Sequence, residues 1–592
     1  MTDLVSLYSS KVEAYTNALQ KLKRQLFYIA IARIGSFLLF IFFIYLAIKG
    51  GGSGPGLFAI IMFAVFLLLV KKSNDLGNEK RLFENRKFVN ENELAILQGG
   101  KNKFDNGSKL LSNESYYADL DIFGEASLFH LLNRCSTSSG YNALADILKH
   151  PSTDAVAIIE KQHAVQALSS QHELREMVIA KALLYKDADN NIEDVKNWLL
   201  QPVRLLGNNW INIVRFLLPL LNVVALIYSL ATGTYAYLSL TILISWLHVG
   251  YYTAYINRQY MLLGRKQEIL NQYAHVLMTF LNVKTNAASL LQQMADEATV
   301  AHTEISRLAK LSNLLDQRLN LLVNILLNSF LLYDVQCMAA LESWKVKNKD
   351  KVSSWISCVA SIEVFTSLSA FAFNRSAYCY PVLGGDKLII EAEEVGHPLI
   401  DEAESVRNDI SLGTDNKLLL ITGSNMSGKT TFLRTVGINI LLAQCGAPVC
   451  AKSFKFSPVD IYTSIRISDS LQEHTSYFMA ELKRLSEIKE QLIPNKPSLV
   501  LIDEILRGTN SEDKYFGSAE FIKQLVQYNC LTLFATHDLK LSEMEQQYKG
   551  VIENYCFESM IEGDDLKFNY KILNGVAKNK NASFLMKKMK II

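Results

Sequence analysis

The first long apolar stretch of the chain lies near its beginning. Residues 34–48 carry no charge, residues 57–70 are wholly apolar, and the glycine-rich segment 50–56 separates them. A membrane-spanning helix needs about 20 predominantly apolar residues. Each run is slightly shorter than this, but the first reaches that length when it is extended back past Arg33 to Leu26, with the charged end of Arg33 directed toward water. The pattern predicts a transmembrane helical hairpin over 26–72.

A second uncharged stretch covers residues 216–257, and His248 is its only group that titrates near neutral pH. Thr232-Gly233-Thr234 divides it into two halves of about 20 residues each, the length of a spanning helix. It therefore predicts a second transmembrane hairpin, over 211–257. The alternative for both hairpins is a pair of helices buried in a large soluble core.

Positively charged residues flank both predicted hairpins, whereas the turns between their helices carry almost none. Because positive flanks are characteristic of the cytoplasmic side, both chain ends and all soluble segments are predicted to be cytoplasmic. The flanking residues are Lys21, Lys23, Arg24, Lys71, Lys72, Arg204, Arg215, Arg258, Arg265 and Lys266.

The segments outside the hairpins are mostly helical in pattern up to residue 380. Residues 1–25 predict a cytoplasmic helix, and the polar residues 73–120 predict a linker with a short helix. Residues 121–210 and 258–380 have apolar positions three and four apart, which predicts two parts of one all-α core or lever domain. One such stripe, interpreted as core packing, consists of Leu311, Leu314, Leu315, Leu319, Leu322 and Leu326.

Residues 381–592 follow another pattern, in which short apolar runs alternate with helical stretches. The runs at 388–390, 418–421, 499–502 and 531–535 are typical of buried strands in a mostly parallel sheet. This part of the chain is predicted to be an α/β domain.

Composition narrows the class of protein. Among 592 residues, 49% are apolar and 20% charged, which excludes a disordered, collagen-like or disulfide-dependent chain. Lys and Arg number 60 against 58 acidic residues, so no global basic field indicates nucleic acid. The eight cysteines form no C-x-x-C motif and are interpreted as reduced thiols of a cytosolic compartment.

A phosphate-binding motif lies in the α/β domain. Gly423-Ser424-Asn425-Met426-Ser427-Gly428-Lys429-Thr430 fits G-x-x-x-x-G-K-[ST], follows a predicted strand and opens a helix near Thr431. The glycines allow backbone N–H groups to surround phosphates at a helix N-terminus. Lys429 is predicted to reach the β- and γ-phosphates of ATP, and the Thr430 hydroxyl to ligate Mg²⁺.

Two further predicted strands end in polar side chains. The run 499–502 leads into Asp503 and Glu504, and the run 531–535 leads toward His537. Asp503 is predicted to hold Mg²⁺ and Glu504 to polarise the attacking water. His537 is a candidate sensor of the γ-phosphate.

These residues resemble the MutS family of ATP-dependent DNA mismatch-repair proteins. The resemblance covers about 390–585 and rests on four motifs besides the phosphate loop. They are Gly396-His397-Pro398, Asp469 to Glu481 with Ser476-Tyr477-Phe478-Met479-Ala480-Glu481, Asp503-Glu504-Ile505-Leu506-Arg507-Gly508-Thr509, and Ala535-Thr536-His537. A weaker resemblance at Leu131 to Gly140 is similar to the start of the family's helical core and lever region.

The resemblance implies an ABC-like P-loop ATPase and a dimer. The segment around Ser476 is similar to the ABC-type signature, which implies that Ser476 of one subunit caps the γ-phosphate bound by the other. Two departures accompany it. No segment before residue 115 is long enough for the family's mismatch-reading domain, and Phe123-Gly124-Glu125, although wedge-like, directly precedes the core motif.

The sequence therefore predicts a membrane-anchored MutS-like ATPase that hydrolyses ATP to ADP and phosphate as a dimeric conformational switch, with ATP and Mg²⁺ bound. Two alternatives stay open. One is a mismatch-repair-type protein tethered to the membrane that binds mismatched or structured DNA. The other is a nucleotide-gated scaffold without hydrolysis, which the presence of Lys429, Asp503 and Glu504 disfavours. Because duplex binding depends on phosphate neutralisation, the nearly neutral charge predicts weak DNA binding without mismatch preference.

Overall fold

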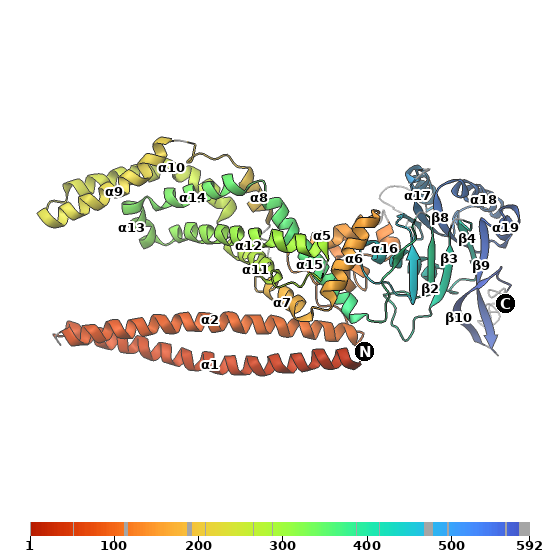
Figure 1. The fold of residues 1–592 in the computed structure, drawn as a ribbon, viewed down its shortest axis with the longest axis horizontal. Helices are drawn as coiled ribbons and strands as arrows, with labels where there is room; N and C mark the ends of the chain where they lie inside the picture. Colours follow the sequence, from red (N-terminus) through yellow and green to blue (C-terminus); the bar gives the residue numbers. More distant parts are fainter. Residues whose placement is uncertain are drawn as a thin grey trace.

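The protein is elongated, with an α/β domain at one end and two helical arms that extend from it side by side (Figure 1). This arrangement comes from a computed structural model. It describes residues 2–50, 53–111, 116–185, 192–207, 209–264, 266–286, 288–385, 387–413, 415–466, 477–493, 496–562 and 565–578.

One arm is an antiparallel hairpin of two long helices, α1 (Thr2–Ile48) and α2 (Ser53–Leu97), called here the N-terminal hairpin. The linker predicted over 73–120 is wrong for residues 73–97, which form the second half of α2. Although this half is polar, a narrow apolar stripe with Leu76 and Val89 is buried. The i,i+4 ion pair Lys80–Glu84 (3.5 Å) adds helical support. Few apolar positions are therefore enough for a helix that packs on one side only.

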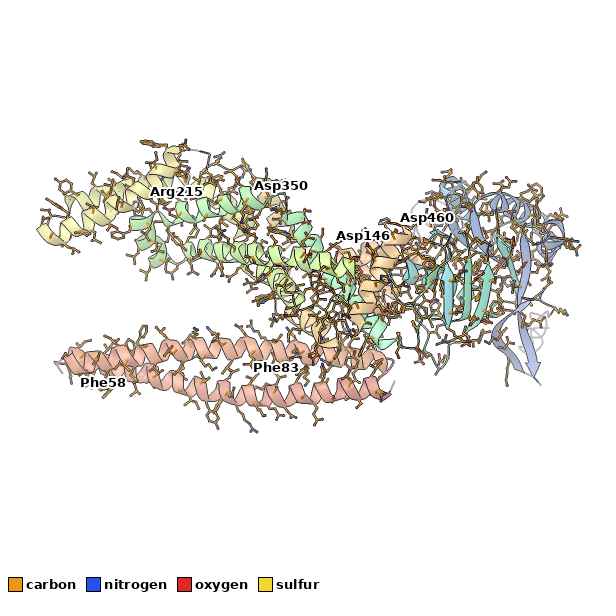
Figure 2. All side chains as sticks on the ribbon, viewed as in Figure 1. Phe58, Phe83, Asp146, Arg215, Asp350 and Asp460 are labelled. Atoms are coloured by element: carbon orange, nitrogen blue, oxygen red, sulfur yellow. The ribbon has the colours of Figure 1, made fainter. Side chains whose placement is uncertain are left out.

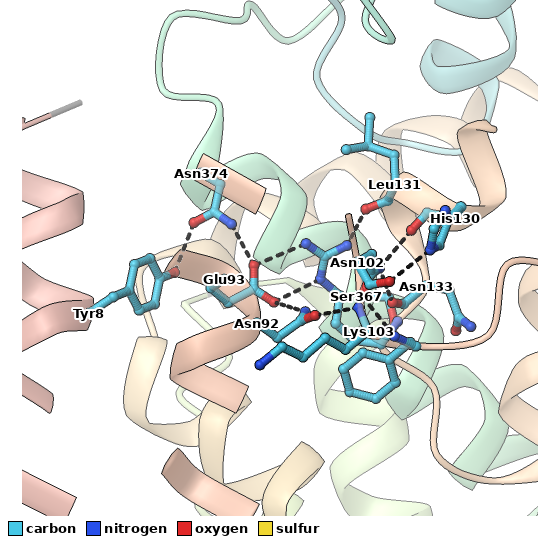
Figure 3. Close-up of polar contacts among 12 residues, drawn as sticks. Tyr8, Asn92, Glu93, Asn102, Lys103, His130, Leu131, Asn133, Ser367 and Asn374 are labelled. Carbon is cyan, nitrogen blue, oxygen red and sulfur yellow. Dashed lines mark hydrogen bonds and ion pairs between the residues drawn. The ribbon is translucent and has the colours of Figure 1, made fainter. Parts of the chain in front are cut away.

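A buried ion pair fixes the base of the N-terminal hairpin to the other arm (Figure 3). Glu93 of α2 accepts hydrogen bonds from Arg134 Nε (3.0 Å), Arg134 Nη2 (2.9 Å) and Asn374 Nδ2 (2.6 Å). Tyr8 of α1 donates to Asn374 Oδ1 at 2.8 Å. Burial by itself raises the pKa of Glu93, but Arg134 and the hydrogen bonds outweigh it and hold that pKa below its usual value.

A second carboxylate repeats this arrangement nearby. Glu176, on the helix α7 (His172–Ala182), accepts hydrogen bonds from Tyr15 Oη (2.6 Å) and Arg86 Nε (2.5 Å), and it pairs with Lys11 Nζ at 3.0 Å. Because Tyr15 and Lys11 belong to α1 and Arg86 to α2, both helices of the hairpin are held at this point.

The other arm is a helical region whose central, mostly buried helix is α15 (Val352–Asn374). Glu363 of α15 accepts backbone hydrogen bonds from Ser136 (2.8 Å) and Thr137 (3.2 and 3.3 Å), which fixes the chain just before α5. The remaining helices of this arm are η1 (Ser108–Leu110), α3 (Tyr116–Asp119), α4 (Leu128–Leu132), α5 (Ser138–Lys149), α6 (Ala155–Ser169), α8 (Ile192–Leu200), α11 (Gln267–Phe280), α12 (Ser289–Asp316), η2 (Gln317–Leu319), α13 (Leu321–Leu331) and α14 (Tyr333–Asn348).

The helices α9 (Asn209–Thr232) and α10 (Ala236–Leu263) form the predicted second helical pair, called here the distal hairpin, at the far end of this arm. Among the described residues, α1, α2, α9 and α15 are long and apolar enough to cross a membrane, judged by length and composition alone. The α15 window is 83% buried inside the fold and therefore forms core. α10 lies outside this set, because His248 and several tyrosines reduce its apolar character.

The predicted core stripe of leucines is only partly correct. Leu315 is fully buried, but Leu319, Leu322 and Leu326 are exposed. α12 ends at Asp316, so the spacing of three and four continues across a break onto a separate helix, α13. Periodicity predicts a face of one helix and cannot detect that a second helix has begun.

The α/β domain contains two sheets. A four-stranded sheet has the order β1-β5-β2-β3, and a six-stranded sheet has the order β10-β9-β4-β8-β7-β6, parallel except for the β9–β10 pair. Three predicted strands are confirmed as β4, β7 and β8, whereas the run at 388–390 overlaps β2 (Ile390–Val395) only at Ile390.

The strands of this domain are β1 (Val382–Leu383), β2 (Ile390–Val395), β3 (Asn408–Leu412), β4 (Leu418–Gly423), β5 (Ser453–Phe456), β6 (Asp460–Ser464), β7 (Ser498–Asp503), β8 (Cys530–Thr536), β9 (Ile552–Glu562) and β10 (Asp565–Asn574). Its helices are α16 (Lys429–Gln444), α17 (Tyr477–Gln491), α18 (Ser511–Gln527), η3 (Leu539–Glu543) and α19 (Met544–Gln547). Because β4, β7 and β8 are parallel neighbours, their carboxyl ends meet at one edge of the sheet.

Candidate functional site

A cavity of about 720 Å³ opens where the parallel strands end. Among the predicted site residues it is lined by 424–431, Asp503 and His537. Gly423 and Glu504 lie beside the cavity without lining it. Further lining comes from Val395, His397, Ile400, Glu404, Ser405, Val406, Asn408, Phe432, Arg434, Thr435, Ile465, Arg466, Arg507, Phe557 and Tyr570.

The loop between β4 and α16 curls around the Lys429 side chain. Lys429 Nζ donates hydrogen bonds to the carbonyl oxygens of Gly423 and Ser424, each at 2.9 Å. Gly428 has φ 107°, and a Cβ at Gly423 would lie 2.7 Å from the Phe557 carbonyl oxygen, so both positions require glycine. Burial lowers the pKa of Lys429 to about 8. An anion in the cavity would restore full charge to this ammonium.

Two oxygen-bearing side chains meet beside Lys429. Thr430, in the first turn of α16, donates from Oγ1 to Asp503 Oδ2 at 2.5 Å. The Ser427 hydroxyl is buried and has no hydrogen-bond partner within the described structure. Hydroxyl and carboxylate oxygens of this kind suit Mg²⁺, which binds one or two protein oxygens together with phosphates and water. The residues present therefore fit a Mg²⁺–nucleotide complex.

Glu504 is held by cations at the rim of the cavity. It pairs with Lys514 Nζ of α18 (2.5 Å) and with Arg507 Nε (3.3 Å), and His537 Nε2 lies 3.9 Å away. Burial by itself raises the pKa of Glu504, but the hydrogen bond and charge of Lys514, together with the charge of Arg507, outweigh it and hold that pKa below its usual value. Burial and the Lys429 charge lower the pKa of His537, whose Nε2 lies 3.5 Å from Lys429 Nζ. Glu504 is thus a carboxylate, and His537 is neutral at physiological pH.

Three arginines that line the cavity were missed as site residues by sequence reasoning. Arg434 and Arg466 share one partner, Asp121, at 3.0 and 2.5 Å. Arg507 Nη2 donates to the Asp503 carbonyl oxygen at 3.1 Å. The position of Arg434, one helical turn after Thr430, could have identified it. The other two depend on contacts between distant parts of the chain.

The helical region reaches the cavity through a short segment before α4. Asp119 accepts hydrogen bonds from Thr463 Oγ1 (2.6 Å) and from the backbone N–H groups of Ile465 (3.1 Å) and Arg466 (2.7 Å). It therefore fixes the end of β6, beyond which the predicted signature segment begins. Ser476 itself lies outside the described residues.

The described part of that segment contacts the Asp503–Arg507 stretch. Glu481 of α17 is fully buried and accepts a hydrogen bond from the Arg507 backbone N–H at 3.1 Å. Burial raises the pKa of Glu481. The helix α17, which contains the end of this segment, is therefore joined to the loop that carries Glu504.

Comparison with known families matches two parts of the chain. Residues 419–590 match MutS domain V, and residues 109–372 match MutS domain III. The chain carries domains III and V of the MutS family. Domain V is the ABC-type P-loop ATPase domain, which confirms the predicted fold of this part. Domain III accounts for the helical region and includes the distal hairpin within its matched range.

Curated relatives share part of this chain. "DNA mismatch repair protein MutS" of Ruminiclostridium cellulolyticum is 38% identical over 238 residues, which cover 38% of this chain and 26% of the relative. The protein of the same name from Clostridium kluyveri is 37% identical over 246 residues, or 40% and 27% of the two chains. That of Thermotoga maritima is 34% identical over 216 residues, or 36% and 27%. The matched region spans about a quarter of each relative.

The wedge-like Phe123 lies within the domain III match and is buried. Its ring contacts the rings of Phe129, with centroids 5.6 Å apart, and Tyr117, at 5.9 Å. A buried ring in an aromatic cluster is a packing residue, in agreement with its unsuitable position in the sequence.

Proposed function

We propose that domain V binds ATP with Mg²⁺ and hydrolyses it to ADP and phosphate. The observation that carries the proposal is the convergence of Lys429, Thr430 and Asp503 on one cavity lined by the phosphate loop. Lys429 would contact the β- and γ-phosphates, while the loop from Gly423 to Thr431 supplies backbone N–H donors. Thr430 and Asp503 would hold Mg²⁺, which neutralises charge on the phosphate oxygens.

Glu504 is proposed as the group that orients and polarises the attacking water. Its low pKa keeps it ionised, as a base must be, but Lys514 and Arg507 hold it outside the cavity lining. The nucleotide-bound state therefore requires Glu504 to leave these cations. His537, beside Lys429, is proposed to sense the γ-phosphate as a neutral hydrogen-bond donor.

A homodimer is proposed to complete each site. The resemblance to the family assigns Ser476 to the γ-phosphate held by the opposite subunit, and two identical sites at one interface suit a two-fold dimer. ATP would then tighten the dimer. Asp119 and Asp121 are proposed to transmit the change to domain III, because they connect Arg434, Arg466 and the end of β6 to the start of the helical region.

The two hairpins are proposed to anchor the protein in a membrane with domain V in the cytoplasm. Exposed large apolar side chains such as Leu38 of α1, Leu68 of α2 and Leu220 of α9 support this, since water is a poor solvent for such surfaces. The tips of both hairpins lie at the same end of the molecule, away from domain V (Figure 1). In Figure 2, Phe58 marks the apolar half of the N-terminal hairpin and Phe83 the half beside domain III.

The test uses purified full-length protein in lipid vesicles. Lys429→Ala is expected to lose ATP binding, because the main charge on the phosphates is gone. Mixing Lys429→Ala with Ser476→Ala is expected to restore one working site per heterodimer. Wild-type nucleotide affinity in Lys429→Ala would overturn the ATP site, and absence of recovery in heterodimers shown to form would overturn the shared site.

DNA is a second candidate ligand, because the relatives are named DNA mismatch repair proteins. The nearly balanced charge of this chain favours weak binding without mismatch preference. Titration of the protein with homoduplex, mismatched and branched DNA tests whether it binds DNA and whether it prefers a mismatch. A tenfold preference for a mismatch, equivalent to about 1.4 kcal/mol, would support the repair-type function.

A further inference from the structure

Three helices at the far end of domain III, α9, α10 and α13, bury polar side chains and expose apolar ones. Asn222 of α9, Ser245 of α10 and Asn328 of α13 are fully buried. Leu220 of α9, by contrast, is 59% exposed, and large apolar side chains of the other two helices also face outward. A helix in water buries its apolar face and exposes its polar face. The reversed arrangement indicates an apolar solvent around all three helices.

The buried polar groups join the three helices to one another. Asn222 Nδ2 donates to Ser245 Oγ (2.9 Å) and to the Ser329 carbonyl oxygen (3.0 Å). Trp246 Nε1 donates to Ser329 Oγ at 3.0 Å. Inside a bilayer the hydrophobic effect gives no force between helices, so hydrogen bonds and close packing hold them together. This network therefore suits a bundle immersed in lipid.

α13 is the unexpected member of this bundle, because it belongs to neither hairpin. Leu322 and Leu326 on its surface are 71% and 58% exposed. Its 11 residues rise about 16 Å, roughly half the thickness of a hydrocarbon core. α13 and α14 together have the length and composition of a bent span, but α14 buries Asp334, Glu342 and Lys345 inside the fold, so α13 alone faces outward and is too short to span.

The two ends of α13 suit a segment that enters and leaves on the same side. Asn320 Oδ1 caps the first turn by accepting from the N–H groups of Leu322 and Val323, at 3.1 and 3.4 Å. After α13 the chain turns at Leu332, which has φ 51°, and α14 continues at 82°. Arg318, before α13, pairs with Asp334, after it, at 3.0 Å. This ion pair holds the residues before and after α13 together and places both charged groups on the same side of the segment.

We propose that α13 is a re-entrant helix whose outward face lies in the acyl chains of the bilayer, beside the distal hairpin. The inference rests on the proposed membrane anchoring and adds a third membrane element that is too short to span. Lipid is the occupant that fits. α13 packs against α9, which exposes Leu220, and the tip of the N-terminal hairpin, with its exposed apolar side chains, lies at the same end of the molecule (Figure 1).

The experiment places single nitroxide labels on the full chain in phosphatidylcholine–phosphatidylglycerol vesicles. Leu322→Cys and Leu326→Cys report on α13, and Leu220→Cys reports on the distal hairpin. Val300→Cys is the matched control, because Val300 is also apolar and 51% exposed but lies on α12. The native cysteines are buried or half-buried, and the labelled parent chain measures their background. Unchanged ATPase rates verify that each variant is folded. If only one of the two α13 variants folds, that variant alone is enough for the test.

The readout is the ratio of collisions with oxygen, which enriches in lipid, to collisions with a water-soluble nickel chelate. A ratio at Leu322 or Leu326 several-fold above that at Val300, and similar to Leu220, is expected. A high ratio at Leu220 with a Val300-like ratio on α13 would overturn the re-entrant helix and leave membrane anchoring intact. Shielding of α13 from both reagents would replace lipid by a protein surface, and thus also overturn it. A water-like ratio at Leu220 would overturn the anchoring by the distal hairpin and this inference together.

Discussion

The base of the N-terminal hairpin and the nucleotide site both bury charged groups, but they satisfy them differently. At the base, Glu93 and Glu176 have cations and hydroxyl or amide donors as partners within the protein. In the proposed nucleotide site, the hydrogen-bond partners of Lys429 Nζ among the described residues are two backbone carbonyl oxygens and a histidine, and the buried Ser427 hydroxyl has no partner there. A carboxylate whose charge is paired within the protein indicates a structural role, whereas a cation and a hydroxyl without such partners at the lining of a cavity indicate a ligand site.

The largest effect is expected at the base of the hairpin. Glu93→Ala leaves Arg134 buried without its carboxylate and should lower the free energy of unfolding by about 3–5 kcal/mol. Denaturant unfolding of the detergent-solubilised protein measures the change. Glu84→Ala is the matched control on α2, because Glu84 belongs to an exposed i,i+4 pair and should cost less than about 0.5 kcal/mol. Equal effects of the two variants would contradict the structural role of Glu93.

The same carboxylate predicts a pH dependence with a definite sign. The pKa of Glu93 is lowered in the folded state, so its contribution to stability is fully present above the ordinary glutamate pKa, about 4.3, and disappears as pH falls through the folded value. The stability difference between wild type and Glu93→Gln should therefore shrink below about pH 4. Unfolding curves at several pH values test this, and a difference that grows toward acid would show the opposite sign.

In the nucleotide site, Glu504→Gln is expected to act on the rate and not on the fold. Loss of the proposed base should slow ATP turnover about 10²-fold or more, equivalent to about 2.7 kcal/mol of barrier, with ATP still bound. Single-turnover hydrolysis and nucleotide affinity, measured on the same samples, separate the two steps. Wild-type turnover in this variant would remove Glu504 from the mechanism.

A smaller effect is expected when a cation that pairs with Glu504 is removed. Lys514→Ala removes a cation that lowers the pKa of Glu504, so that pKa should rise and the acid limb of the ATPase profile should move to higher pH. The rate at pH 7.5 should not fall. Lys523→Ala, on the same helix but paired with Glu520, should leave the profile unchanged. A displaced profile in both variants would point to a general effect of α18.

The smallest effect is expected at the connection between the two domains. Asp121→Asn removes the shared partner of Arg434 and Arg466, a partly exposed interaction of about 1 kcal/mol or less. ATP binding should persist, while the ATP-induced change in hydrogen exchange of domain III should weaken. Asp146→Asn, at an exposed position of α5, is the control. An unaltered exchange response in Asp121→Asn would exclude this route of transmission.

Sequence reasoning grouped the residues of the proposed nucleotide site that follow from a local motif or from neighbouring parallel strands. The loop from Gly423 to Thr431 lies between a strand and a helix, as the motif requires, and Asp503 meets Thr430 because β4 and β7 are parallel. It did not predict that Lys514 holds Glu504 at the rim, or that Asp121 connects two arginines of the cavity. Those contacts join segments whose spacing carries no periodic signal.

The sequence by itself determined the local chemistry and the elements with strong periodicity: the phosphate loop, the buried parallel strands and the apolar hairpins. Local motifs determine these, because a G-x-x-x-x-G-K-[ST] loop or an uncharged helix has the same requirements in any fold. Only the tertiary structure decided that the apolar α15 is core, that the leucines of α13 face outward and that polar residues 73–97 are helical. The physical reason is that burial and pairing depend on which surfaces meet, as when Tyr8 bonds to Asn374, 366 positions away.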